Sequence, residues 1–131
     1  MNWIGTSWRA LLAALVGCAL GFVAYGVLAA RSIEAPWAVG VAAGGAAAVV
    51  SVDRSVMRGL VVGTMAIWSA AAAQVHVHPP MHGASLLQGL AAFHATLTWG
   101  RGLSFLVCAL AAVVLGAASI RRSARERVAG T

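Results

Sequence analysis

The sequence predicts an all-α integral membrane protein with four transmembrane helices, both termini in the cytoplasm, and a short external interfacial helix between the third and fourth spans. Of its 131 residues, 61% are apolar and only 9% are charged, whereas a soluble domain carries roughly 25% charged residues. Uncharged stretches cover residues 10–30, 35–52, 59–75 and 102–120, and each is close to the ~20 apolar residues that cross a bilayer. These stretches form a single transmembrane domain and leave no room for a soluble catalytic domain.

The first stretch, residues 10–30, is predicted to be an uncleaved anchor helix. A cleavable signal peptide has an apolar region of ~7–15 residues, whereas this stretch is uncharged over 21 residues. Leu28 also stands where a cleavage site requires a small residue. Cys18 in this stretch and Cys108 in the last one have small apolar neighbours, so we expect both to pack as free thiols.

The second and third stretches, residues 35–52 and 59–75, are expected to form an antiparallel hairpin around a tight turn. The third stretch reaches only about 25 Å at ~1.5 Å per residue, against a ~30 Å hydrocarbon core. Thinning of the bilayer, snorkelling of Arg54 and Arg58, or burial in a larger assembly would cover the difference. Asp53 in the turn is expected to cap the third helix, to pair with an arginine, or to be solvated.

Residues 76–99 are predicted to form an external segment that joins a His-containing loop to a short interfacial helix. Within it, Leu86, Leu90, Phe93 and Leu97 recur at three- and four-residue steps, which is typical of an apolar helix face. A fifth span is the alternative, but it would move the arginine-rich tail to the external side, against the charge rule. An interfacial or re-entrant helix is therefore preferred.

The arginines predict the orientation, because short loops rich in arginine stay on the cytoplasmic side. With both termini inside, only Arg31 and Arg101 of the nine basic residues lie outside. The basic tail, residues 121–131, would also attract anionic lipid headgroups. Nucleic acid is not a predicted partner, because lysine is absent and the arginines are dispersed. The residues predicted to set the topology or to contact headgroups are Arg54, Arg58, Arg121, Arg122, Arg125 and Arg127.

Pairs of small residues, one helical turn apart, recur in every predicted span. Lipid tails are as apolar as leucine, so helices in a bilayer associate through close backbone contact, and small residues at this spacing allow it. These grooves either meet one another within one chain or face another subunit. Three glycine grooves exceed what a minimal bundle needs, which favours packing against a larger membrane complex or as a homo-oligomer. The pairs are Gly17 and Gly21, Gly40 and Gly44, Gly59 and Gly63, and, in weaker form, Ala112 and Gly116.

A cluster of histidines follows the third stretch. Imidazole and thioether ligands together suit copper, so His76, His78, Met81 and His82 are candidate copper ligands. A weakly pH-responsive surface is the alternative for this loop. A haem or a chlorin at His94 is disfavoured, because no other histidine lies within a span to complete its ligation.

The chain carries no arrangement that is typical of a catalytic site, and we expect no enzyme activity. No acid or base stands at the centre of a span, where proton relays and coupled carriers place them, and a Gly-x-Ser-x-Gly elbow is missing. The sequence thus favours a non-catalytic small subunit in the cytoplasmic membrane of a bacterium. Copper handling is one alternative. A small oligomeric channel is the other, with Thr64, Trp68 and Ser69 lining a neutral pore, although Ser and Thr more often bond to a helix carbonyl.

Overall fold

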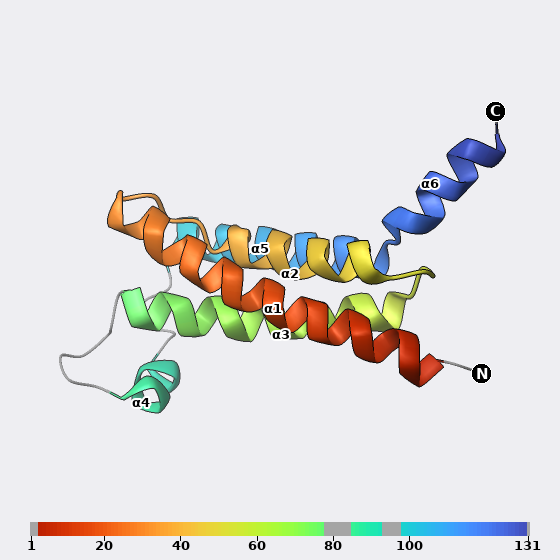
Figure 1. The fold of residues 1–131 in the computed structure, drawn as a ribbon. Helices are drawn as coiled ribbons and strands as arrows, with labels where there is room; N and C mark the ends of the chain where they lie inside the picture. Colours follow the sequence, from red (N-terminus) through yellow and green to blue (C-terminus); the bar gives the residue numbers. More distant parts are fainter. Residues whose placement is uncertain (1–2, 78–84, 93–97, 131) are drawn as a thin grey trace.

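The computed structural model describes residues 3–77, 85–92 and 98–130, and within these ranges the chain is helical without a strand (Figure 1). Four helices form a bundle, and two more lie at its ends. The bundle helices are α1 (Trp3–Ala30), α2 (Trp37–Val50), α3 (Val56–Val77) and α5 (Trp99–Ala117), and the end helices are α4 (Leu86–Ala91) and α6 (Ile120–Ala129).

The bundle helices run antiparallel to one another in chain order (Figure 1). α2 packs against α1 and α5, and α3 packs against the same two helices. The start of α1, the turn at 51–55 and α6 lie at one end, which we call the basic end. The turn at 31–36, the last turn of α3 and the start of α5 lie at the other end, which we call the far end.

Three helices are long and apolar enough to cross a membrane, namely residues Trp8–Ala30 of α1, all of α3 and all of α5. α2 is also apolar but has only 14 residues, so it extends about 21 Å at ~1.5 Å per residue. The described chain is therefore an all-helical protein with three candidate membrane-spanning helices and one shorter apolar helix packed among them.

The helix boundaries differ from the predicted spans at the turns. α2 is shorter than the predicted 35–52, because Pro36 stands at its N-terminal cap and Ser51 adopts extended backbone. α3 continues to Val77, beyond the predicted end at residue 75. α5 ends at Ala117 and not at residue 120, because Ala118 is extended and Ser119 then begins α6 as its N-cap. The basic tail is thus a separate helix.

α4 begins with a capping box and covers one side of α3. The Ser85 backbone N–H donates to Gln88 Oε1 at 3.0 Å, and the Gln88 backbone N–H donates to Ser85 Oγ at 3.3 Å, which satisfies two otherwise unpaired donors at the helix start. Gly89 faces the Val75 side chain of α3. With six residues, α4 is much shorter than the predicted interfacial helix. Phe93 and Leu97 of the predicted apolar stripe lie outside the described residues.

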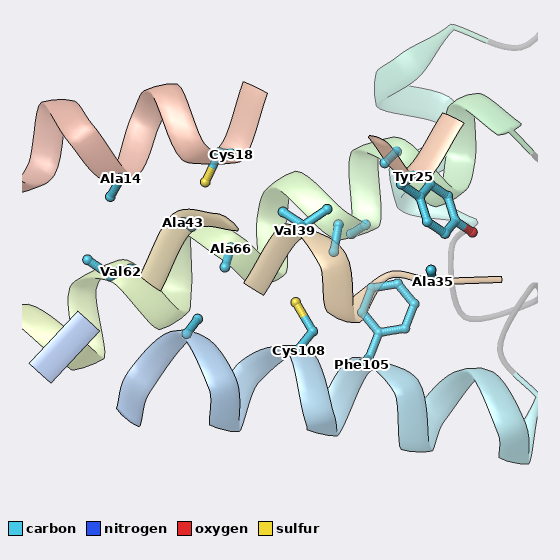
Figure 2. Close-up of a cluster of buried hydrophobic side chains, with 14 of the residues drawn as sticks. Ala14, Cys18, Tyr25, Ala35, Val39, Ala43, Val62, Ala66, Phe105 and Cys108 are labelled. Carbon is cyan, nitrogen blue, oxygen red and sulfur yellow. The ribbon is translucent and has the colours of Figure 1, made fainter. Parts of the chain in front are cut away.

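The interior of the bundle is built mainly from small side chains, and Figure 2 shows them converging from all four helices. Large apolar side chains lie on the outer surface instead, as with Leu20 at 65% and Leu110 at 57% exposed. Soluble proteins bury such side chains, whereas helices in lipid gain stability from close backbone packing between small residues. Labelled members of the core are Ala14, Cys18, Tyr25, Ala35, Val39, Ala43, Val62, Ala66, Phe105 and Cys108.

Candidate functional site

The first predicted glycine pair lies at the contact between α1 and α2. Gly17 faces the α2 backbone at Ala42 and Ala43, and Gly21 faces Val39. A Cβ atom added at Gly21 would stand 2.6 Å from the Val39 Cα atom, which is closer than two carbon atoms approach without a shift of the backbone. The two helices therefore approach as closely as they do because neither residue carries a side chain.

The second pair lies at the contact between α2 and α5. Gly40 faces the α5 backbone at Cys108, and Gly44 faces Leu115 and Ala112. A Cβ atom at Gly44 would stand 2.8 Å from the Leu115 Cβ atom. Ala112, a member of the weaker predicted pair, is fully buried in this contact.

The third pair lies at the contact between α3 and α5. Gly59 faces the Val113 carbonyl oxygen, Gly63 faces the Val113 side chain, and Gly116 of α5 faces Val62 and Gly59. Every predicted groove is thus occupied by another helix of the same chain. Of the two alternatives predicted for the grooves, the described contacts are those within one chain. Packing against another subunit stays a prediction, and a partner helix would have to contact other surfaces.

A buried polar pair joins α1 to α3 near the far end. The Tyr25 side chain is 0% exposed and that of Gln74 is 1% exposed, and the Tyr25 hydroxyl donates a 2.5 Å hydrogen bond to Gln74 Oε1. Tyr25 follows Gly21 by one helical turn, so it lies on the same inward face of α1. Separation of the two side chains would leave two unpaired polar groups in an apolar interior, so the pair favours one register of α1 against α3.

The Gln74 amide has a second polar atom, and this one is unpaired. Among the buried side-chain nitrogen and oxygen atoms of the described residues, Gln74 Nε2 is the one that has no hydrogen-bond partner. A buried donor left in this way costs about 1–3 kcal/mol, and an acceptor such as a water or a carbonyl oxygen would remove that cost. Tyr25 and Gln74 therefore form an uncharged hydrogen-bonded pair in which one buried donor still lacks an acceptor.

An ion pair closes the far end above this site. Arg101 Nη2 donates to Glu34 Oε1 at 2.7 Å, and Arg101 Nε lies 3.1 Å from each carboxylate oxygen. The Arg101 and Glu34 side chains are 21% and 41% exposed. The pair links the turn at 31–36 to the first turn of α5, which stabilises the closure of the helices at this end.

The histidine cluster falls largely outside the described part of the chain. His76 lies in the last turn of α3, is exposed, and has its ring centroid 5.8 Å from that of Phe22. Within the described ranges, no three His, Cys, Asp or Glu side chains lie close enough to hold a metal ion. Copper binding therefore stays a prediction. The candidate ligands His78, Met81 and His82, and also His94, lie outside the described residues.

Arg58 at the basic end is buried, with 8% of its surface exposed. Its Nε donates to the Gly116 carbonyl at 2.7 Å, and its Nη2 donates to the carbonyls of Asp53, Ala117 and Ala118 at 2.8, 3.2 and 3.0 Å. The last carbonyls of a helix have no N–H partner within the helix, so the guanidinium caps α5. Of the alternatives predicted for Arg58, snorkelling to the lipid headgroups does not agree with this burial, and a role in the topology stays a prediction.

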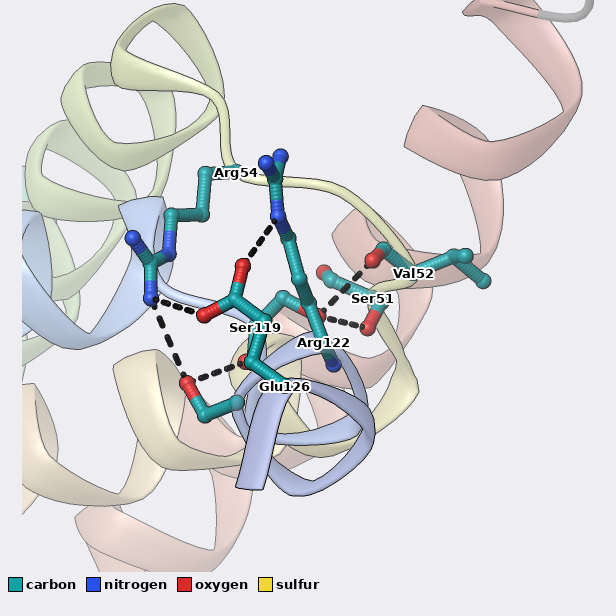
Figure 3. Close-up of polar contacts among 7 residues, drawn as sticks. Ser51, Val52, Arg54, Ser119, Arg122 and Glu126 are labelled. Carbon is teal, nitrogen blue, oxygen red and sulfur yellow. Dashed lines mark hydrogen bonds and ion pairs between the residues drawn. The ribbon is translucent and has the colours of Figure 1, made fainter. Parts of the chain in front are cut away.

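Polar contacts attach α6 to the basic end (Figure 3). The Ser119 hydroxyl donates to the Ser51 carbonyl at 2.7 Å. Glu126 accepts from Arg122 Nε at 2.9 Å, and its other carboxylate oxygen lies 3.6 Å from Arg54 Nη2. Both pairs are more than half exposed, so each contributes at most about 1 kcal/mol.

The residues predicted to line a pore lie mostly on the outer face of α3. Thr64 is exposed and its hydroxyl donates to the Leu60 carbonyl at 3.0 Å, and Trp68 is 63% exposed. Ser69 is half-buried. A pore lined by Thr64 and Trp68 would therefore have to form between chains.

No protein-family model, curated protein or solved structure matches this chain, so the geometry alone defines the candidate site. Its central residues, Tyr25 and Gln74, were missed from the sequence. A signal existed, because Tyr25 is the single tyrosine of the chain and lies within an uncharged stretch. Polar side chains inside apolar helices bond across helix contacts, which makes such residues candidates for pairing.

Proposed function

We propose that the chain is a non-catalytic small subunit of a larger membrane complex, with four membrane spans and both termini in the cytoplasm. One observation carries the proposal. α2 has 14 residues and an uncovered face, on which Trp37, Val41 and Val49 are 43%, 44% and 54% exposed. A helix of about 21 Å is shorter than a ~30 Å hydrocarbon core, and such a mismatch favours association with neighbouring helices.

The uncovered face of α2 is the surface proposed to receive the partner, since the glycine grooves are occupied. Two adjacent glycines distinguish the uncovered face of α2 from the face that contacts α5. A Cβ atom added at Gly45 meets no atom within 4 Å, whereas one added at Gly44 stands 2.8 Å from Leu115 Cβ. Gly45 would let a partner helix approach closely, and Gly44 already does this for α5.

Native mass spectrometry of the full chain extracted in mild detergent tests the proposal. We expect a particle heavier than one chain for the wild type. Gly45→Leu should release the partner and leave a folded single chain, because its side chain enters open space. Gly44→Leu is the matched control, and it should destabilise the bundle itself. A wild-type particle of one chain, or one that Gly45→Leu leaves unchanged, would overturn the proposal. A particle that contains only copies of this chain would replace the larger complex with a homo-oligomer.

The proposed orientation places the basic end in the cytoplasm. Its support is the distribution of arginine, because Arg31 and Arg101 belong to the far end and the other described arginines to the helices and turns of the basic end. A membrane-impermeant maleimide tests this in whole cells. Ile33→Cys at the far end should be labelled in intact cells, and Ala129→Cys in α6 only after lysis. The reverse pattern would invert the topology.

A further inference from the structure

A cleft of about 400 Å³ opens on the outer surface at the basic end, between the start of α3, the end of α5 and α6. One wall is apolar and belongs to the bundle surface, whereas the other wall is polar and belongs to the turn at 51–55 and to α6. The apolar lining residues are Val56, Val114, Ala117 and Ala118, and the polar ones are Arg54, Ser55 and Ser123.

The apolar wall continues the outer surface of the membrane-spanning helices. Val56 is 72% exposed and Val114 is 65% exposed, and Val114 lies one turn deeper along α5 than Ala118. An acyl chain that extends from the cleft along α5 would therefore contact Val114. The polar wall lies at the end of the spans, where lipid phosphate groups are found.

The polar wall holds a cation whose contacts are long. Arg54 Nη2 lies 3.4 Å from Ser123 Oγ and 3.6 Å from Glu126 Oε2, and the Arg54 side chain is 56% exposed. A guanidinium has five N–H donors in a planar fork that matches a phosphate. Glu126 lies closer to Arg122, at 2.9 Å, so a phosphate can take the place of Glu126 at Arg54 while the pair with Arg122 remains.

Arg58 offsets the partial negative charge of the backbone carbonyls that lie next to the cleft. The carbonyls of Ala117 and Ala118 belong to the C-terminus of α5, whose partial negative charge would repel a phosphate. Both carbonyls accept hydrogen bonds from Arg58 Nη2. The Ser55 hydroxyl accepts the Arg58 backbone N–H at 3.3 Å, which leaves its own hydrogen to be donated to a ligand.

α6 supplies a second feature that fits a membrane surface. Ile120, Ala124 and Val128 recur every four residues and so share one face of the helix, and Ile120 and Val128 are 54% and 76% exposed. The rest of the helix is rich in arginine, which is typical of helices that lie in the interface of an anionic bilayer. α6 would then hold Ser123 at the depth of the phosphate groups.

We propose that this cleft binds one anionic phospholipid. Arg54, Ser55 and Ser123 hold its phosphate, and Val56 and Val114 contact the first part of an acyl chain. Arg54 lies in the turn at the end of the spans and Val114 lies one turn inside α5, which matches the order of headgroup and chain in a phospholipid. The inference requires that the basic end lies at a membrane surface, but it does not depend on a partner at α2.

Native mass spectrometry of the delipidated full chain, titrated with phosphatidylglycerol or phosphatidylcholine, tests the inference. We expect one phosphatidylglycerol to be retained, with binding about tenfold weaker in Arg54→Gln, because a charge-assisted contact is lost. Arg125→Gln is the matched control. It removes the same charge from exposed α6 outside the cleft, and it should change binding by less than about twofold.

A second variant tests the apolar wall without a change of charge. Val114→Trp fills the cleft from an exposed position of α5 and should also weaken retention of phosphatidylglycerol. Equal losses in Arg54→Gln and Arg125→Gln would overturn the inference in favour of general surface attraction. Equal retention of phosphatidylcholine, displacement of the lipid by inorganic phosphate alone, or no retention by the wild type would overturn it as well.

Discussion

Replacement of Arg58 by methionine should destabilise the bundle more than any other substitution of an arginine at the basic end. The methionine side chain fills much of the same buried volume but removes all four hydrogen bonds that the guanidinium donates to backbone carbonyls. The carbonyls of Gly116 and Ala118 then lose the side-chain donor that caps the end of α5, whereas the Ala117 carbonyl still accepts the Ser55 backbone N–H at 3.0 Å. The effect should therefore concentrate at the contact between α3 and α5.

The expected magnitude follows from the burial of each bond. The buried bond to the Gly116 carbonyl contributes about 1.5–3 kcal/mol, as is typical for a charged donor. The three partly buried bonds contribute about 0.5–1 kcal/mol each, because water replaces some of the lost donors. Removal of a buried charge also returns part of its desolvation cost. The free energy of unfolding should thus fall by less than the sum of the four bonds, by about 2–4 kcal/mol.

Arg54→Met is the matched control, because Arg54 lies four residues earlier in the same region and is more than half exposed. It should lower the free energy of unfolding by at most about 1 kcal/mol. Unfolding of the purified chain in mixed detergent micelles, followed by tryptophan fluorescence, measures both variants. If Arg58→Met and Arg54→Met reduce stability equally, the capping role assigned to Arg58 is refuted.

Three further predictions concern the far end and the outer surface. Tyr25→Phe should lower the free energy of unfolding by about 1 kcal/mol. The double variant Tyr25→Phe, Gln74→Leu should lose less stability than the two single variants lose together, and additive losses would contradict the hydrogen bond between Tyr25 and Gln74. Glu34→Gln should cost at most about 1 kcal/mol at low salt and less at high salt; a loss that salt does not change would exclude a surface ion pair with Arg101. Thr64→Val should leave unfolding within about 0.5 kcal/mol of the wild type, and a larger loss in the same assay would place Thr64 in a packed contact.

Much of the fold could be predicted from local sequence properties. An uncharged apolar stretch of suitable length forms a helix in any lipid environment, because its backbone groups must bond within the stretch. The prediction of an all-helical chain with membrane-spanning helices agrees with α1, α3 and α5. The ends of the helices were harder to predict. Ser119 was predicted to lie inside the fourth span, but it caps a separate helix, α6.

The candidate site was harder to predict from the sequence, because its residues are distant in the chain. Tyr25 and Gln74 are separated by 49 positions, and Arg58 and Gly116 by 58. No local pattern specifies which buried polar side chains will meet across such distances. Gln74 in particular precedes a polar, proline-containing segment, so its neighbours in sequence suggest a loop although its neighbours in space enclose it.

The sequence by itself determined that the described chain is all-helical with apolar helices long enough to cross a membrane, and it determined the glycine positions at which helices approach closely. These properties depend on hydropathy and side-chain size along the chain. Only the tertiary structure decided which helix faces each groove, that Gly44 contacts α5 while Gly45 faces outward, and that Arg58 caps α5 while Arg54 lines a cleft. Adjacent or nearby residues of one type acquire different roles because helix rotation directs them to different surroundings, and that rotation is fixed by the packing of all four helices together.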